Sequence, residues 1–453
     1  MPKLSVIIAS DSHWEHIEDT IESLENQTSD DFEVIFIRPQ KESEAEKPIA
    51  DFCSRAEGRF DVIEECGITP KLFNRGLIAA SGEYIMFLTP GDFLPPDSIE
   101  NFLYAAESRA DIITGRFWLN RENSEPGYNK FADAVVLRPE IDRFSAYLPR
   151  CHELGCRIFR IRSLQKHNIE FPLVPVMYDY LFFMRAVLSG MKISGTPYGI
   201  LYRKIRTISD FDIREGLPTK ENLQITLDAF KEIEKLAILR ITEETGIFEG
   251  DEYYIQELLD SQISYLIDCF YRRIWLMDDE TLGLLKSAIG EMMEKLTDSR
   301  KERLKEEHKD ITFPFMYDSI QDAANEPTFS FILDVPKGSA KELIDSFYLQ
   351  TFPFFELFVS ESVADSGRAG DRWLDSPNFY IAPDRNFHAV ARAHAKSKTI
   401  ILIKDNTPLD SEVLKATYSA KVPNALKSAI FTKNRIQKRM RTSLKNKGAS
   451  LKD

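Results

Sequence analysis

Leu4-Ser5-Val6-Ile7-Ile8 is followed by a helix-like run that ends in Ser23-Leu24-Glu25-Asn26-Gln27-Thr28, and then by Phe32-Glu33-Val34-Ile35-Phe36-Ile37. The same order returns far along the chain: Phe329-Ser330-Phe331-Ile332-Leu333, then Ile344, Ser346 and Gln350-Thr351, then Phe355-Glu356-Leu357-Phe358-Val359. Each copy predicts strand, helix, strand, which is the opening of a parallel α/β sheet. Because a repeat defines the architectural unit, we predict two related sheets.

The bulk composition is that of a folded globular protein. The chain has 453 residues, enough for two or three domains, and 43% of them are hydrophobic. No apolar run is long enough to cross a bilayer, and the N-terminus lacks the layout of a signal peptide. The five cysteines are scattered without a CxxC pair, which favours reduced thiols in a cytoplasmic protein over a disulfide framework or a zinc site.

The net charge of −14 is unevenly distributed. Residues 421–453 hold ten Lys or Arg and one acid, so this tail is basic and the rest of the chain is strongly acidic. Nucleic-acid binding is therefore not expected of the body. The tail has two main interpretations that the sequence leaves open: a solvated segment, or a polybasic helix that attaches the protein to an anionic membrane surface.

The hydrophobic periodicity divides the chain into four parts. Strands and helices alternate in residues 1–214, with strands expected at Phe60–Glu64 and Tyr84–Leu88 and helices at Leu72–Ala80, Ile99–Glu107 and Asp179–Ser189. Residues 215–322 are expected to be helical, with a charged linker-like run over 301–310. Residues 323–420 form the partial second copy, and 421–453 the basic tail.

Further pieces follow the first copy in a fixed order. They are Asn74-Arg75-Gly76, the run Ala80–Leu88, Asp92 with Pro96-Asp97, Ile158-Phe159-Arg160, Tyr178-Asp179 and Tyr202-Arg203. Each piece is weak alone, but the ordered set resembles the family-two, inverting glycosyltransferases of GT-A fold, which make bacterial surface polysaccharides and glycoconjugates. The resemblance covers about the first 210 residues. It implies a nucleotide-sugar donor and a glycan or lipid-linked acceptor.

The resemblance also implies a metal site in the turn after Tyr84–Leu88. The family usually carries Asp-Ser-Asp-Asp there, whereas this chain has Thr89-Pro90-Gly91-Asp92. One carboxylate, with phosphate oxygens and waters, can still hold Mg²⁺ or Mn²⁺, so Asp92 is the candidate metal ligand. Alternatively, Asp92 only closes a Pro-Gly turn.

Asp179 matches the general base of the family, although the Glu that normally precedes it is Tyr178 here. An Asp at the start of a helix is also an ordinary cap, and the helix dipole would weaken it as a base. An apolar pocket would counteract this effect. The candidate pocket residues are Leu173, Val174, Val176, Tyr178 and Phe182.

The candidate donor contacts lie at predicted strand ends and in further segments that match the family pattern. They are Ala9, Ser10, Asp11, Arg38, Asn74, Gly76, Asp92, Arg203 and Arg206. Arg38 stands where the family places acids that hold the nucleobase, and Phe73 replaces its usual Arg before Asn74. Arg203 and Arg206 are suited to clamp a diphosphate, because their guanidinium groups present a fixed fork of donors; surface ion pairs are their ordinary alternative.

Two functional hypotheses remain from the sequence. The first is an active, cytoplasmic and peripherally membrane-associated glycosyltransferase, favoured by the retention of Asp92, Asn74 and Asp179 together. The second is an inactive GT-A pair that acts as a scaffold or glycan-binding subunit, favoured by the departures from the family at Thr89, Gly91, Arg38 and Phe73. The second copy has Lys404-Asp405-Asn406 at the metal turn and no acceptor half, so we expect it to be non-catalytic.

Overall fold

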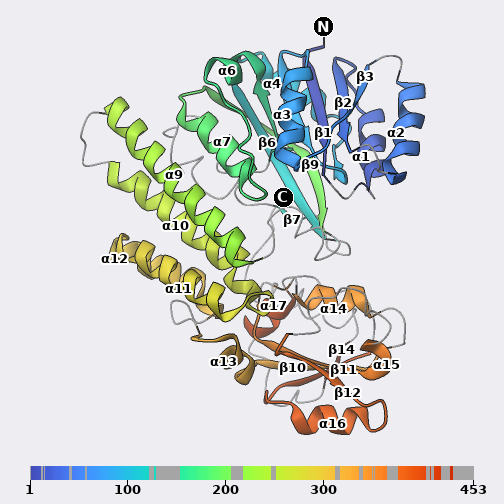
Figure 1. Ribbon diagram of the computed structural model, residues 1–453, viewed down its shortest axis with the longest axis vertical. Coiled ribbons are helices and arrows are strands. Elements are labelled where there is room, and N and C mark those ends of the chain that lie inside the picture. The colour runs from blue at the N-terminus through green and yellow to red at the C-terminus, as the bar shows by residue number, and fades with distance from the viewer. Residues whose placement is uncertain are drawn as a thin grey trace, which may run out of the picture. The chain divides into compact units, whose positions relative to one another are not determined.

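The computed structural model describes most of the chain (Figure 1). The described residues are 2–11, 14, 16–39, 43–56, 59–121, 127–128, 154–205, 218–245, 251–311, 317–335, 340–348, 350, 352–364, 376–404, 409, 413–419 and 429–431. The chain divides into two compact units. Unit 1 comprises residues 1–206 and 224–262, and unit 2 comprises residues 207–223 and 263–453. The helical region is therefore divided between the two units, whereas the division into four parts given above stays a prediction.

Half of the sheet in unit 1 is parallel. Its strands are β1 (Leu4–Ala9), β2 (Phe32–Arg38), β3 (Phe60–Glu64) and β4 (Tyr84–Leu88), in the spatial order β3-β2-β1-β4. The connecting helices are α1 (Ile17–Glu25), α2 (Ser43–Arg55) and α3 (Thr69–Ala79). All six residues of β1 are buried, as expected of a strand covered on both faces. The predicted strands at 60–64 and 84–88 are confirmed, and the helix predicted from Leu72 begins three residues earlier, at Thr69.

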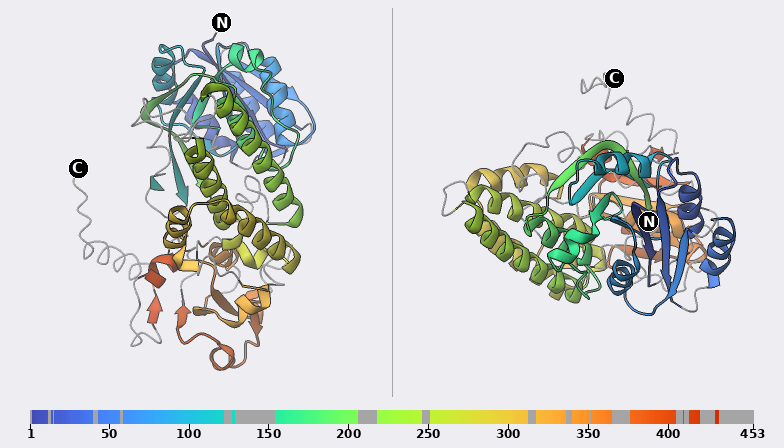
Figure 2. Two further views of the ribbon diagram at one scale, coloured as in Figure 1. Left: turned by 90° about the vertical axis from the view of Figure 1, so that its left-hand side faces the viewer. Right: turned by 90° about the horizontal axis from the view of Figure 1, so that it is seen from above.

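The other half of this sheet is mixed. Its strands are β5 (Asp92–Phe93), β6 (Ile112–Arg121), β7 (Gly127–Tyr128), β8 (Arg157–Arg160) and β9 (Ile193–Ile205), and its helices are α4 (Ser98–Ala106), α6 (Ile161–Lys166) and α7 (Tyr178–Leu188). Strand β8 pairs antiparallel with β4 and with β6, and β9 runs parallel to β6. Figure 2 shows this sheet from two further sides. The predicted mixed α/β architecture is confirmed.

Long helices follow, as predicted. They are α9 (Lys220–Thr245), α10 (Asp251–Cys269), η1 (Tyr271–Leu276), α11 (Asp279–Glu294), α12 (Asp298–Glu307), η2 (Lys309–Ile311) and α13 (Ile320–Asn325). Figures 1 and 2 show α9 and α10 side by side, and the Nε2 of Gln262 approaches the carbonyl oxygen of Phe230 to 3.4 Å. No helix among the described residues is long and apolar enough to span a bilayer.

The prediction of a linker over residues 301–310 is wrong, because α12 occupies most of this stretch. Leu304 is fully buried and anchors the helix. Around it, Lys301 pairs with Asp298, and Lys305 pairs with Glu302, each three residues apart. Such spacing places opposite charges on neighbouring turns, which supports a helix even when its composition is very polar.

Unit 2 contains a parallel sheet of five strands. They are β10 (Phe329–Leu333), β11 (Phe355–Ser360), β12 (Phe379–Ala382), β13 (Ile400–Ile403) and β14 (Ala429–Phe431), in the order β12-β11-β10-β13-β14. Helices α14 (Lys341–Tyr348), α15 (Glu361–Ala364), α16 (Phe387–His394) and α17 (Val413–Ser419) connect them. The first four strands thus repeat the order β3-β2-β1-β4 of unit 1.

Each of the two sheets contains the same pattern of side-chain hydrogen bonds at equivalent positions. In unit 1 the Oγ of Ser5 donates to Oε1 of Glu33 over 2.6 Å, and in unit 2 the Oγ of Ser330 donates to Oε1 of Glu356 over 2.5 Å. The Nε2 of Gln27 donates to a carbonyl four residues earlier, as does that of Gln350. These matched contacts support the predicted second partial α/β repeat. The sheets differ after the fourth strand, because β14 pairs directly with β13, whereas β8 lies next to β4.

Candidate functional site

The carboxyl ends of the parallel strands in unit 1 lie at one edge of the sheet. Ala9 pairs with Ile37 and Ile8 with Leu88, so β1, β2 and β4 end at the same level. In parallel α/β sheets this edge is where loops converge and ligands bind. The structure therefore gathers there the segments that begin with Ser10, Arg38 and Thr89.

The loop after β1 is fastened to the start of α3. Asp11 is exposed, and its backbone N–H lies 3.3 Å from Oγ1 of Thr69, whose hydroxyl in turn lies 3.2 Å from Oδ1 of Asp11. Ser10 is buried, and its carbonyl oxygen accepts a 3.3 Å hydrogen bond from the indole of Trp14. Sequence analysis missed Thr69, although a Thr followed by Pro70 is a common way to begin a helix.

Arg38 ends β2 with a largely buried side chain, which is 11% exposed. One guanidinium nitrogen lies 3.8 Å from Oε1 of Glu64, too far for a hydrogen bond. Its Nε is buried and has no hydrogen-bond partner among the described residues. This guanidinium therefore retains donor capacity at the edge where the loops converge.

Asp92 is fully buried and is turned onto its own loop. Its Oδ2 accepts hydrogen bonds from the backbone N–H of Thr89 at 2.9 Å and from Oγ1 of Thr89 at 3.0 Å. Gly91 has φ +91°, a conformation that favours glycine, and its N–H donates to Oγ1 of Thr20. The Asp92 backbone pairs with Arg203 of β9. Asp92 thus has a clear part in the turn itself.

The described residues do not fit a metal centre built by the protein. They contain no group of three or more His, Cys, Asp or Glu side chains placed to hold a metal ion. The carboxylate of Asp92 is inaccessible to solvent and already accepts two hydrogen bonds from Thr89. Within this part of the chain, Asp92 as the sole protein ligand remains a hypothesis without geometric support.

Asp179 lies in the first turn of α7 and is half-buried. The residue that caps this helix is Met177, in the left-handed conformation at φ +61° and ψ +8°. Oδ1 of Asp179 accepts a 2.8 Å hydrogen bond from the N–H of Tyr180. Val176 and Met177 are buried beside it, but Leu173 is 65% exposed and so contributes little to the expected apolar pocket.

An aromatic cluster ties the start of α7 to α3 and to β4. Phe171 stacks on Phe182 with ring centroids 3.9 Å apart, and its ring meets that of Phe87 edge-on at 4.9 Å. Tyr178 reaches Phe73 at 6.3 Å. Phe73 lies one turn from Thr69, which contacts Asp11. The structure therefore brings the N-terminus of α7 towards the carboxyl edge of β1, and it explains Phe73 as a packing residue.

Asn74 and Gly76 have clear structural contacts on α3. The Nδ2 of Asn74 donates to the carbonyl oxygen of Phe171 at 2.9 Å, and its Oδ1 accepts from the N–H of Phe171 at 2.8 Å. Gly76 is buried against the sheet, where a Cβ would lie 2.5 Å from a methyl carbon of Ile7. The role of either residue in donor binding is a prediction that these contacts do not support directly.

The side chains of the two predicted diphosphate-binding arginines lie outside the described residues. The backbone of Arg203 belongs to β9, but its side chain lies outside the described set, as does the whole of Arg206. The basic tail is also outside it, apart from residues 429–431. Predictions about these groups therefore stay predictions.

Comparison with known proteins identifies relatives of the N-terminal part. Residues 5–168 match the family model described as glycosyl transferase family 2. The chain is 26% identical over 220 residues to EpsH of Bacillus subtilis (strain 168), which carries the name of a glycosyltransferase. That match covers 46% of this chain and 62% of EpsH, less than two thirds of the relative's length.

Two solved structures illustrate a similar course of the chain. S. aureus TarS 1–349 in complex with UDP-GlcNAc has a TM-score of 0.47 and 16% identity, and the match covers 67% of this chain and 83% of that one. The mannosyltransferase PcManGT from Pyrobaculum calidifontis, in complex with GDP-Man and Mn²⁺, has a TM-score of 0.39 and 11% identity. That match covers 69% of this chain and 81% of PcManGT.

Proposed function

We propose that this chain, whose residues 5–168 form a glycosyl transferase family 2 domain of GT-A fold, is an inverting glycosyltransferase. It would move a sugar from a nucleoside-diphosphate donor to a glycan or lipid-linked acceptor of the bacterial surface-polysaccharide type. The observation that carries the proposal is the aromatic contact between Tyr178 and Phe73, because it links the helix of the candidate base to the carboxyl edge of the sheet.

Asp179 is the general base of this proposal. In an inverting displacement, the acceptor hydroxyl attacks the anomeric carbon from the face opposite the leaving diphosphate, and a carboxylate removes its proton. Asp179 is half-buried and has one oxygen, Oδ1, directed to a backbone N–H. We assign removal of the acceptor's proton to this carboxylate.

The donor would lie along the carboxyl edge, against Ser10, Asp11 and Arg38. The Arg38 guanidinium is the described cation best placed there, since it ends β2 and its Nε has no partner among the described residues. A guanidinium fork suits phosphate oxygens. Arg203 and Arg206 remain further candidates for the same diphosphate.

The proposal gives no role to the Mg²⁺ or Mn²⁺ expected at Asp92, and the metal is only added or omitted in the binding test. The buried carboxylate and its two hydrogen bonds with Thr89 give no support to a protein-built site. A cation bound mainly by the diphosphate and water is compatible with one protein carboxylate. We therefore assign no step of the reaction to it.

A thermal-shift screen tests donor binding directly. UDP, GDP, CMP and dTDP sugars are added with and without Mn²⁺, and we expect one of them to raise the melting temperature, since a ligand that binds only the folded state stabilises it. Hydrolysis of that donor, followed as the appearance of free nucleotide, then measures turnover. Asp179→Asn should abolish turnover and leave the thermal shift unchanged, because the amide keeps the shape but accepts no proton.

The second candidate is an inactive GT-A pair that serves as a scaffold or a glycan-binding subunit. The observation that favours it is the inward orientation of Asp92, together with the use of the Asn74 amide by the backbone of Phe171. The same screen separates the two candidates. No shift with any sugar nucleotide, combined with a shift caused by an oligosaccharide, would reject the transferase and favour the binding subunit.

Peripheral attachment to the inner face of a membrane is a separate proposal that rests on the basic residues of 421–453. Sedimentation with vesicles of anionic lipid, compared with neutral lipid and with a chain truncated after residue 420, measures it. Equal sedimentation of the full and truncated chains would contradict a role of the tail.

A further inference from the structure

The side-chain amide of Asn74 is fitted to the backbone of a residue 97 positions away. Its Nδ2 donates to the Phe171 carbonyl at 2.9 Å and its Oδ1 accepts from the Phe171 N–H at 2.8 Å. Two antiparallel hydrogen bonds to one residue fix both its distance and its orientation, as one rung of a β-ladder does. Asn74 therefore holds the beginning of the segment that leads to α7.

Phe171 transmits this position to the first turn of α7. Its ring lies parallel to that of Phe182, with centroids 3.9 Å apart and an interplanar angle of 3°. Both rings are almost completely buried. Phe182 follows Asp179 by three residues, so the two side chains lie on neighbouring turns of one helix. A shift of Phe171 would consequently move the turn that carries Asp179.

The other end of the segment is held by a strained residue. Met177 adopts φ +61° although it is neither Gly nor Asn, and its side chain is buried. A left-handed conformation is unfavourable for an ordinary residue, so it persists only where the surroundings enforce it. Two prolines, Pro172 and Pro175, further restrict the chain between Phe171 and Met177. The segment 171–177 is thus fixed at both ends and stiff between them.

We propose that Asn74 is a positioning residue for Asp179, which acts through the segment 171–177 rather than by touching the donor. This inference rests on the proposed function, because it assigns a role in the same reaction. It also replaces the donor contact that the family resemblance implies for Asn74. The geometry requires only that the carboxylate of Asp179 stay within a narrow range of directions for proton transfer. A displacement of about 1 Å can cost 10²-fold in rate.

The test compares Asn74→Ala with a matched truncation, Gln27→Ala. Gln27 also uses its amide to join distant backbone groups, since it donates to the carbonyl of Pro95 at 2.8 Å and accepts from the N–H of Ile99 at 3.1 Å. Gln27 lies just after α1 and these groups lie at or near the start of α4, and none of them belongs to the segment 171–177 or to α7. Both variants should lose comparable stability, so the comparison isolates the effect on Asp179.

Two quantities are measured for each variant. The first is the rise in melting temperature caused by the sugar nucleotide that gave the largest shift. The second is the rate at which that donor is hydrolysed to free nucleotide. We expect Asn74→Ala to lower kcat on the order of 10²-fold with an unchanged shift, and Gln27→Ala to change neither. Loss of the shift in Asn74→Ala would make Asn74 a donor contact and overturn the positioning role. Equal kcat in the two variants would overturn it as well.

A double variant tests the shared route by a second, independent measurement. Because Asn74 and Met177 act on the same segment, Asn74→Ala with Met177→Gly should lose less kcat than the product of the single losses. If the loss of kcat in the double variant equals the product of the single losses, the two residues act independently and the shared route is refuted. If the unmodified chain neither shifts nor releases nucleotide, the proposed function itself fails, and the positioning role fails with it.

Discussion

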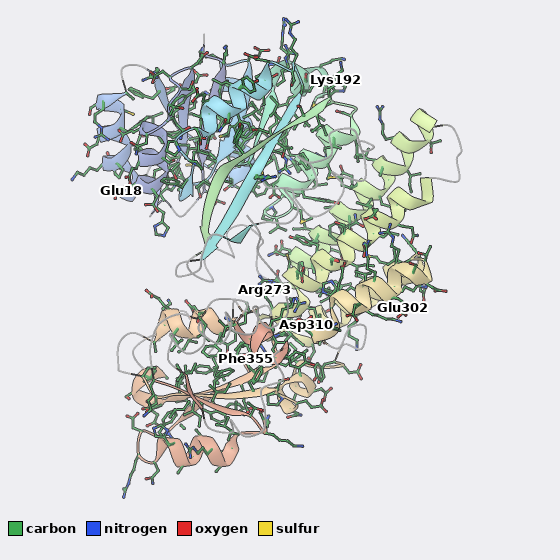
Figure 3. All side chains as sticks on the ribbon, turned by 180° about the vertical axis from the view of Figure 1, so that it is seen from behind. Glu18, Lys192, Arg273, Glu302, Asp310 and Phe355 are labelled. Carbon is green, nitrogen blue, oxygen red and sulfur yellow. The ribbon has the colours of Figure 1, made fainter. Side chains whose placement is uncertain are left out.

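Removal of the Asp310 carboxylate should destabilise unit 2 severely. Arg272 and Asp310 are both less than a tenth exposed, and the guanidinium donates to the two carboxylate oxygens at 2.7 Å and 3.2 Å. Arg272 also donates from Nε to Asp268 at 2.9 Å, and Lys415 lies 3.8 Å from Asp310. The pair therefore joins η1 to η2, with α10 and α17 at its margins (Figure 3, which labels Asp310).

The magnitude follows from the charge that the substitution leaves behind. Loss of one partner of a buried ion pair typically costs 3–5 kcal/mol, because the other charge stays buried. Asp268 remains beside Arg272 in Asp310→Asn, and it is half-exposed, so it compensates only partly. We therefore expect a loss of about 3 kcal/mol, the lower end of that range.

The effect should depend on pH in a defined direction. Burial alone would raise the pKa of the Asp310 carboxyl, but the hydrogen bonds and charge of Arg272, with the charge of Lys415, outweigh it and hold that pKa below its usual value. The stabilisation is thus complete above the unfolded pKa of about 3.9 and is lost as pH falls through the lower folded value. The difference between the two proteins should shrink below about pH 4.

The assay is urea denaturation, monitored by hydrogen exchange in peptides from residues 263–311. Asp318→Asn is the control, because Asp318 pairs with Lys286 at 2.6 Å but is 93% exposed, and surface pairs contribute little. Equal stability of Asp310→Asn and Asp318→Asn at neutral pH would refute the reasoning.

Three further predictions concern other substitutions. Asp92→Ala should lower the free energy of unfolding by about 1–3 kcal/mol, because the N–H of Thr89 loses its buried acceptor; unchanged stability with a lost Mn²⁺ response in nucleotide binding would instead make Asp92 a metal ligand. Gly76→Ala should cost about 1–3 kcal/mol by overpacking α3 against β1, which thermal unfolding measures, and an unchanged melting temperature would contradict that close approach. Glu33→Gln should cost more stability than Glu356→Gln, as local hydrogen exchange would show.

Much of the fold could be predicted because its signals are local. Short apolar runs bounded by turns identify β1 and β4, and a three-to-four residue period identifies α7. Parallel strands then bring their carboxyl ends together without further information. The convergence of the loops after β1, β2 and β4 requires nothing beyond the order of these elements.

The roles of single residues depended on distant contacts, and the sequence could not provide them. Asn74 meets Phe171, whose position follows only from the packed aromatic cluster. The inward turn of Asp92 depends on the conformation of Gly91 and its neighbours. The charged run with Leu304 was misjudged because one buried residue decides whether a polar segment packs as a helix.

The paired glutamates distinguish the two sheets where their backbones agree. Glu33 uses both oxygens: Oε1 accepts from the N–H of Ser81 at 2.8 Å, and the hydroxyl of Ser81 lies 2.9 Å from both Oε1 and Oε2. At the equivalent place unit 2 has Lys396, whose N–H donates to Oε1 of Glu356 at 2.7 Å but which brings no hydroxyl.

Oε2 of Glu356 is consequently buried without a hydrogen-bond partner among the described residues. Oε1 of Glu356 accepts from Ser330 and Lys396, but its unsatisfied partner oxygen carries a desolvation cost that a neutral amide avoids, so Glu356→Gln should cost less than Glu33→Gln. Glu33→Gln sacrifices charge-assisted bonds worth about 1.5–3 kcal/mol each. Exchange in β1 should therefore accelerate more after Glu33→Gln than exchange in β10 after Glu356→Gln. Equal acceleration would show that the orphaned oxygen has no energetic consequence.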